Sequence, residues 1–180
     1  MILARRALLL AAFAWPARAD SSVPEPDGFR MDDYRAPVPD TVRGGTVLHT
    51  EALRALIARA PPVLIDVLPA PRRPPAMRPE APWLPPRHHA IPGSLWWPDV
   101  GRGALSPELE TRFRARLAEV TAGDAARLVV FYCLADCWMS WNATRRAAAW
   151  GVRAAWYPEG ADGWKAAGLP LAELAPEALD

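Results

Sequence analysis

One segment of the sequence is the most informative: Leu128-Val-Val-Phe-Tyr-Cys-Leu-Ala-Asp-Cys-Trp-Met-Ser-Trp-Asn-Ala-Thr-Arg-Arg146. Its first five residues form a continuous apolar run rich in β-branched and aromatic side chains, which is typical of a buried parallel strand. Residues 139–150 contain no Pro or Gly and several alanines, which favours a helix. The segment therefore predicts a strand, a short turn and a helix.

Both cysteines of the chain, Cys133 and Cys137, lie in the predicted turn. A strand–turn–helix unit directs backbone N–H groups and the positive end of a helix dipole at the turn. Such surroundings lower the pKa of a thiol and raise its thiolate fraction. Because Cys133 directly follows the strand, we expect it to have the lower pKa and to react first. Cys137 lies about one helical turn further on, where the dipole field has largely fallen off.

Apolar segments of strand length alternate with helix-like segments along the rest of the chain. Strands are expected at residues 46–48, 63–67, 94–97, 128–132 and 154–157, and helices after Thr50 and at 107–120, 139–150 and 162–167. This alternation predicts a single α/β domain with about five parallel strands and helices on both faces. Cys133 is expected at the carboxyl end of the central strand, where ligands of open α/β sheets bind.

The chain divides into four parts. Residues 1–19 have the features of a cleavable signal peptide, with Arg5 and Arg6 before a short apolar run and a small-x-small site before Asp20. That run is too short to span a bilayer, so we expect export to the periplasm and no membrane span in the mature chain. Residues 20–45 are predicted to be an irregular Pro-containing arm, residues 46–174 the domain, and residues 175–180 a C-terminal tail.

The charge balance argues against two classes of partner, nucleic acids and membrane surfaces. Without its three arginines at positions 5, 6 and 18, the mature chain has 18 basic and 20 acidic residues, a net charge of −2. The chain has no excess of basic residues that would indicate nucleic-acid binding. It also has no block of like charges that would indicate a membrane-surface patch.

Two further features precede the central segment. Asp66 comes near the carboxyl end of the strand at 63–67, and we include it in the candidate site, although a structural turn hydrogen bond is its favoured role. Residues 69–87 form a long Pro-rich loop with Arg72, Arg73, Arg78 and Arg87. Loops of this length are often functional, but a solvated surface loop explains the composition as well.

Four landmarks in order resemble the rhodanese homology domain. They are the strand Val63-Leu-Ile-Asp-Val67, the turn His89-Ala-Ile-Pro-Gly-Ser94, the segment Val129-Val-Phe-Tyr-Cys133, and Tyr157-Pro-Glu-Gly-Ala-Asp-Gly-Trp164 with Ala167-Gly-Leu-Pro170. The resemblance covers about residues 45–174. It implies a three-layer rhodanese-like domain in which Cys133 is the active-site cysteine of a sulfurtransferase.

Within that superfamily, an export signal with Cys133-Leu-Ala-Asp-Cys137-Trp138 resembles the Cys-x-x-Cys-Trp proteins associated with pyrroloquinoline-quinone (PQQ)-dependent alcohol catabolism, though three residues rather than two separate the cysteines. The resemblance implies an accessory role in alcohol oxidation. The typical sulfurtransferase loop has an arginine where this chain has Trp138. We therefore expect slow or absent thiosulfate turnover, unless Arg72, Arg73 or Arg145 compensates.

Three kinds of chemistry are open to the cysteine pair. In the first, Cys133 is a nucleophile that carries a persulfide or mixed disulfide, Cys137 resolves it, and the resting state is a Cys133–Cys137 disulfide. The second is a purely structural disulfide. The third is a soft-metal Cu(I) site that His88 or His89 completes. Apart from this copper alternative no cofactor is expected, and the absence of Cys-x-x-Cys-His excludes covalent haem attachment.

The expected partners follow from the first chemistry: a small thiol or sulfur donor, or a periplasmic redox protein.

Trp138, as the first residue after the turn, is expected to face the cleft and is included in the candidate site with Cys133, Cys137 and Asp66. The other tryptophans are interpreted as packing residues.

Overall fold

A five-stranded parallel sheet forms the centre of the molecule, in the order β1-β6-β5-β2-β4. The structure is a computed structural model that describes residues 23–177 and 179; the predicted signal peptide lies outside this range. The strands are β1 (Thr46–Val47), β2 (Val63–Asp66), β4 (Leu95–Trp96), β5 (Val129–Tyr132) and β6 (Ala154–Tyr157). The prediction of five parallel strands is confirmed, and β5, which precedes Cys133, is the central one.

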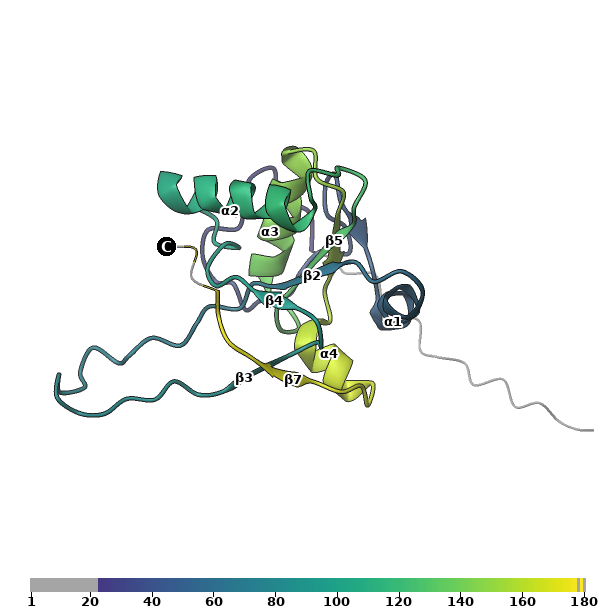
Figure 1. Ribbon diagram of the computed structural model, residues 1–180. Helices are drawn as coiled ribbons and strands as arrows, with labels where there is room; N and C mark the ends of the chain where they lie inside the picture. Colours follow the sequence, from purple (N-terminus) through teal and green to yellow (C-terminus); the bar gives the residue numbers. More distant parts are fainter. Residues whose placement is uncertain (1–22, 178, 180) are drawn as a thin grey trace, which may run out of the picture.

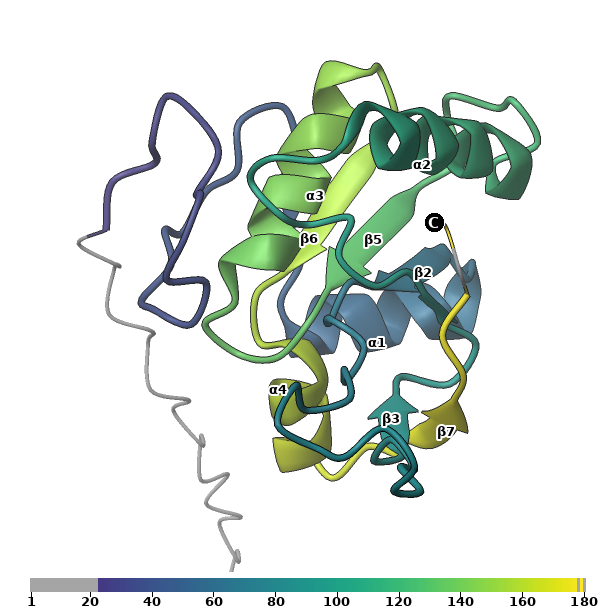
Figure 2. The ribbon, with the colours of Figure 1, turned by 90° about the vertical axis from the view of Figure 1, so that its left-hand side faces the viewer.

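Helices cover both faces of this sheet, as predicted. α2 (Pro107–Val120) and α3 (Trp138–Ala149) lie on one face, and α1 (Thr50–Arg59) and α4 (Gly160–Ala166) on the other (Figures 1 and 2). α2 begins as the sequence indicates, with Pro in its first turn and the Ser106 hydroxyl accepting a hydrogen bond from the Leu109 amide. The three-layer α/β fold class is therefore confirmed.

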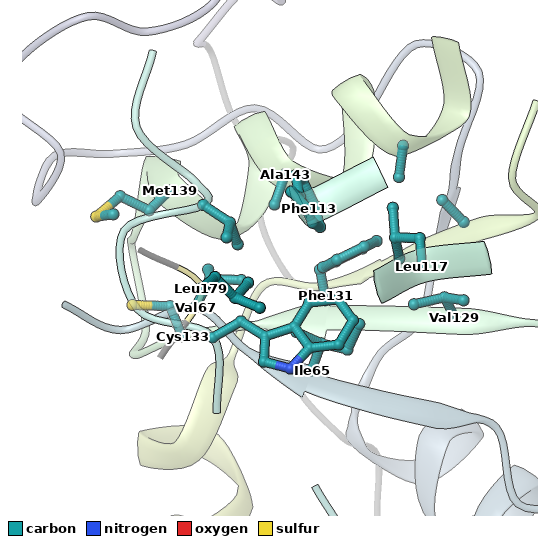
Figure 3. Close-up of a cluster of buried hydrophobic side chains, with 14 of the residues drawn as sticks. Ile65, Val67, Phe113, Leu117, Val129, Phe131, Cys133, Met139, Ala143 and Leu179 are labelled. Carbon is teal, nitrogen blue, oxygen red and sulfur yellow. The ribbon is translucent and has the colours of Figure 1, made fainter. Parts of the chain in front are cut away.

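The alternating side chains of β5 belong to two separate cores. Val129 and Phe131 pack with residues of α2 and α3 (Figure 3), whereas Val130 and Tyr132 pack with residues of α1 and α4. Successive residues of a strand point to opposite faces of its sheet, so a strand covered on both sides must be apolar throughout. This explains the unbroken apolar run before Cys133.

The described part of the N-terminal arm, residues 23–45, contains no helix and no strand beyond the single bridge at Arg35, and it packs along α3 (Figure 2). Val38 and Val42 are buried against Trp138, Trp141 and the β6 residue Trp156. Further along α3, polar side chains of the helix bind main-chain groups of the arm between Pro26 and Arg30. The arm is therefore part of the folded unit.

Two short strands were not expected from the sequence. β3 (His88–Ala90) and β7 (Ala172–Leu174) form an antiparallel pair apart from the main sheet. Between β2 and β3, the Pro-rich segment 69–87 contains no helix or strand and projects from the body of the molecule (Figure 1). Among the described residues, no helix is both long and apolar enough to cross a membrane.

Candidate thiol site

The two cysteines lie together in the turn that joins β5 to α3. Cys133 is completely buried, and Cys137 is 3% exposed. Both are free thiols, and a hydrogen bond between their side chains shifts the pKa of each. α3 starts at Trp138, one residue earlier than predicted, so Cys137 is its N-cap. The residue at the head of the helix is therefore Cys137.

This placement reverses the expected order of thiol acidity. The hydrogen bond from Cys133 is the main influence that lowers the pKa of Cys137, to about 7. The amides of Met139 and Ser140 in the first turn of α3 and the positive charge of Arg35 act in the same direction. The prediction that the dipole field has fallen off at Cys137 is wrong, because this residue itself begins the helix.

Cys133 has the opposite electrostatic surroundings. Its burial raises the pKa of the thiol well above its ordinary value, because a thiolate there would lose its hydration. The hydrogen bond to Cys137 and the negative charge of Asp66 raise the pKa further, and only the Leu134 amide favours the thiolate. As pH rises through neutrality, the pair therefore becomes a Cys137 thiolate and a Cys133 thiol.

Arg35 is a site residue that sequence reasoning missed. It pairs with Cys137 in an antiparallel bridge, next to a 2.9 Å hydrogen bond from the Trp138 amide to the Tyr34 carbonyl. The arm thus passes directly over the cysteine turn and brings a guanidinium group near its sulfur. No local signal marks Arg35, because it is one of several scattered charges in a Pro-containing segment far from the cysteines in sequence.

Two N–H groups of the turn are engaged by other parts of the protein. The Ala135 amide donates to the Asp162 carboxylate at 3.1 Å, and the Trp138 amide donates to Tyr34. The sequence suggested a cradle of free N–H groups that could hold an anionic outer sulfur. In the structure, two of these groups already have acceptors.

A close backbone approach fixes the other side of the turn. The Cys133 carbonyl accepts a 2.8 Å hydrogen bond from the Ala161 amide. Gly160 has a φ of 56°, and a β-carbon on it would lie 2.4 Å from the Cys133 oxygen. Glycine is therefore required at this position both by its conformation and by space.

Asp66 forms the turn hydrogen bond that was expected of it. Its Oδ1 accepts from the Leu68 amide at 2.9 Å, and its Oδ2 lies 2.8 Å from Nε2 of His88. The His88 ring also packs against Trp96 at a tilt of 39°, with ring centroids 4.1 Å apart. Asp66 acts on Cys133 through its charge and is held in place by this buried pair.

The two histidines considered as copper ligands lie side by side in β3, where Nε2 of His88 is bound to Asp66 and the side chain of His89 is exposed. Within residues 23–177 and 179, no group of three or more His, Cys, Asp or Glu side chains is arranged to hold a metal ion. Copper binding by the two thiols alone stays a prediction.

Trp138 does not face a cleft, and that expectation is wrong. Its side chain is buried, and Nε1 donates to the Pro37 carbonyl at 3.1 Å. It packs edge-on against Trp141, with Arg30 over its ring. The first residue of α3 points toward the arm because the arm covers this end of the helix.

Each of the three arginines that could compensate for Trp138 has other partners in the structure. Arg72 pairs with Asp99, and Arg73 donates to three carbonyls of its own loop. Arg145 donates to arm carbonyls and lies over the ring of Trp141. A cavity of 260 Å³ at the base of the Pro-rich loop is lined in part by His88 and Trp96, but by neither cysteine.

No family model matches the sequence, and no curated protein matches it significantly. Among solved structures, thiosulfate sulfurtransferase from Pseudomonas aeruginosa is similar over 75% of this chain, with 25% identity and a TM-score of 0.48. This chain spans only 21% of that protein. A full-length protein from Lactobacillus plantarum has 20% identity over 71% of this chain and 88% of its own, with a TM-score of 0.48.

The polysulfide-sulfur transferase homodimer from Wolinella succinogenes is also similar, with 17% identity over 72% of this chain and 79% of its own and a TM-score of 0.43. TM-scores below 0.5 are too low to transfer the activity of these proteins to this chain.

Proposed function

We propose that this chain is a rhodanese-like thiol protein whose Cys137 and Cys133 carry out thiol–disulfide exchange, Cys137 as the attacking thiolate and Cys133 as the resolving thiol. The observation that carries the proposal is the position of Cys137 as the N-cap of α3, beside the fully buried thiol of Cys133. A thiol whose pKa is near the ambient pH combines a substantial thiolate fraction with good nucleophilicity.

The reaction needs only the two thiols and a substrate disulfide. The Cys137 thiolate attacks one substrate sulfur, a Cys137–sulfur bond forms, and the other substrate sulfur leaves as a thiolate. That thiolate takes up the proton of Cys133. The resulting Cys133 thiolate then attacks the Cys137 sulfur. The Cys133–Cys137 disulfide forms, and the second substrate sulfur leaves and is protonated by water. Two electrons pass from the pair to the substrate, and the reverse sequence oxidises a dithiol.

Sulfur transfer is the related second candidate, since it also begins with attack of a thiolate on a sulfur–sulfur bond. With a sulfane-sulfur donor, the product is a persulfide on Cys137. The Ala135 amide, which could hold its anionic outer sulfur, is bonded to Asp162. This arrangement favours exchange, in which no free outer sulfur has to be stabilised.

We further propose that the protein acts in the periplasm as an accessory to PQQ-dependent alcohol oxidation. The signal-peptide features of residues 1–19 support export. The resemblance of the segment from Cys133 to Trp138 supports the accessory role. Intact-mass analysis of the periplasmic fraction tests the location, and we expect the mass of a chain whose first residue is Asp20. Full-length protein retained in the cytoplasm would contradict the proposal.

Intact-mass analysis of the isolated protein, before and after reductant, tests the chemistry. A disulfide makes the protein about 2 Da lighter, whereas a persulfide adds about 32 Da and copper adds more than either. We expect a reversible 2 Da change in a glutathione redox series, which both Cys133→Ser and Cys137→Ser abolish. Exchange is excluded if the wild-type pair stays reduced across the series and forms no mixed disulfide with glutathione.

A further inference from the structure

We propose that the substrate of the thiol pair is an extended polypeptide segment that presents a cysteine opposite Cys137, in the place that Arg35 of the chain itself occupies. This inference rests on the exchange function proposed above and names its substrate class. Its basis is the antiparallel bridge between the arm and the cysteine turn.

The register of this bridge brings residue 35 within disulfide reach of Cys137. The hydrogen bond from the Trp138 amide to the Tyr34 carbonyl joins the residues that flank the pair, so Arg35 and Cys137 form a non-hydrogen-bonded pair. In such pairs the Cα atoms are about 4.5 Å apart and the side chains lie on the same face. Disulfides form across Cα distances of about 4.4–6.8 Å. A cysteine in the place of Arg35 therefore meets the distance requirement.

Residues 31–36, the part of the arm that lies opposite Cys137, are weakly held. Met31 is 59% exposed, and Asp32, Asp33 and Arg35 are exposed as well. The firm attachments lie on either side of residues 31–36, at the paired hydrogen bonds between Arg30 and Asn142 and at the buried Val38. Asp32 and Asp33 bond only to the neighbouring Arg30, so Tyr34 is the main attachment of the span to the body: its hydroxyl accepts from the Gly103 amide and its carbonyl from the Trp138 amide. Segments with little buried apolar surface open locally at low cost.

Movement of this span is required for any exchange, because Cys137 is only 3% exposed beneath it. Once the span moves, the Trp138 amide loses the Tyr34 carbonyl and becomes an unsatisfied donor beside the reactive sulfur. An extended peptide restores that hydrogen bond with its own carbonyl and aligns its next residue with Cys137, as in other forms of strand addition. A small thiol has no peptide backbone in this register and so does not restore the hydrogen bond. The site therefore favours a polypeptide disulfide.

The intramolecular test is Arg35→Cys, with Ala36→Cys as the matched control. Residue 36 is adjacent but packs toward the cluster around Trp138 and Trp141, so it points away from the Cys137 side. In the Cys133→Ser background, we expect the thiol introduced at position 35 to form a disulfide with Cys137 on mild oxidation at least about tenfold faster than the thiol introduced at position 36. Peptide mapping identifies the bond. Equal rates from the two positions would overturn the proposed register.

The intermolecular test uses Cys133→Ser protein and peptides with the sequence of residues 30–40. One peptide has cysteine at position 35 and the other at position 36, and each is activated as a mixed disulfide with 2-nitro-5-thiobenzoate; glutathione activated in the same way is the small-molecule comparison. We expect the position-35 peptide to react with Cys137 at least about tenfold faster than either of the others. If all three react equally, the substrate class is wrong while exchange stands; if none reacts, exchange itself fails.

Discussion

The carboxylate of Asp66 lies 2.8 Å from Nε2 of His88, and the two side chains are only 1% and 9% exposed. Asp66 ends β2 and pairs in register with Tyr132, the residue before Cys133. His88 begins β3, on the far side of the long Pro-rich loop. One buried pair therefore connects the base of that loop to the strand ends that carry the thiol site.

This relationship makes the reactivity of Cys133 sensitive to Asp66. Asp66→Asn keeps an oxygen for the Leu68 amide but removes the negative charge that helps to raise the pKa of Cys133. In a Cys137→Ser background, we expect the alkylation of Cys133 to begin at lower pH when Asp66 is replaced. Because the partner of His88 is altered, unfolding should also cost about 1–3 kcal/mol less.

The matched control for Asp66→Asn is Glu119→Gln, which removes an exposed carboxylate on α2. It should leave both stability and Cys133 alkylation nearly unchanged. If the pH at which Cys133 begins to react is unchanged or higher in Asp66→Asn, the electrostatic role of Asp66 is contradicted.

Trp138 is predicted to hold the arm in place. Trp138→Phe removes the hydrogen bond to the Pro37 carbonyl while keeping most of the packing against Trp141. We expect a loss of about 1 kcal/mol in the free energy of unfolding and faster alkylation of Cys137 as the arm opens more often. Trp83→Phe, in the Pro-rich loop, is the control and should change neither quantity. Equal effects of the two substitutions would show that Trp138 has no special part in arm docking.

Gly160 is predicted to be essential to the shape of the cysteine turn. Gly160→Ala places a β-carbon 2.4 Å from the Cys133 oxygen, in addition to the cost of its positive φ. Gly168 also has a positive φ, but a β-carbon there meets nothing within 4 Å. Thermal unfolding should therefore show a loss of about 1–3 kcal/mol for Gly168→Ala and a larger one for Gly160→Ala. Similar losses would mean that the close approach has no cost.

Thiosulfate-to-cyanide transfer is predicted to be slow or absent. A dianionic donor needs cationic recognition, yet the position after Cys137 is a buried tryptophan, and Arg72, Arg73 and Arg145 are bound elsewhere. The standard colorimetric thiocyanate assay measures this activity. A turnover number within about tenfold of the median for enzymes, about 10 s⁻¹, would refute the prediction.

The features that the sequence predicted well are those that depend on residues close together in the chain. The apolar run before Cys133, the serine cap and proline at the start of α2, and the alternation of strands and helices each depend on neighbouring residues. These patterns were enough to predict the parallel sheet and to place Cys133 at the end of its central strand. The hydrogen bond of Asp66 to a nearby amide follows from the same local logic.

The features that the sequence did not predict depend on contacts between distant segments. The β3–β7 pair joins residues on either side of the whole central segment, and no period marks such short strands. Docking of the arm turned Trp138 from an expected cleft residue into a buried one and brought Arg35 to the thiols. The reversal of the two pKa values came mainly from the burial of Cys133 and its interaction with Cys137, and in smaller part from a helix start displaced by one residue, a boundary that local propensity does not fix.

The most direct test of the account measures the alkylation rate of each thiol as a function of pH, by peptide mass analysis of the reduced wild-type protein. The thiolate fraction rises as pH increases through the pKa, so Cys137 should be half-maximally reactive near pH 7 and Cys133 only at clearly higher pH. Cys133→Ala, which removes the hydrogen bond to Cys137, should move the Cys137 midpoint upward, whereas Cys133→Ser should move it less. A Cys133 that reacts at lower pH than Cys137 would contradict the assignment of Cys137 as the attacking thiolate.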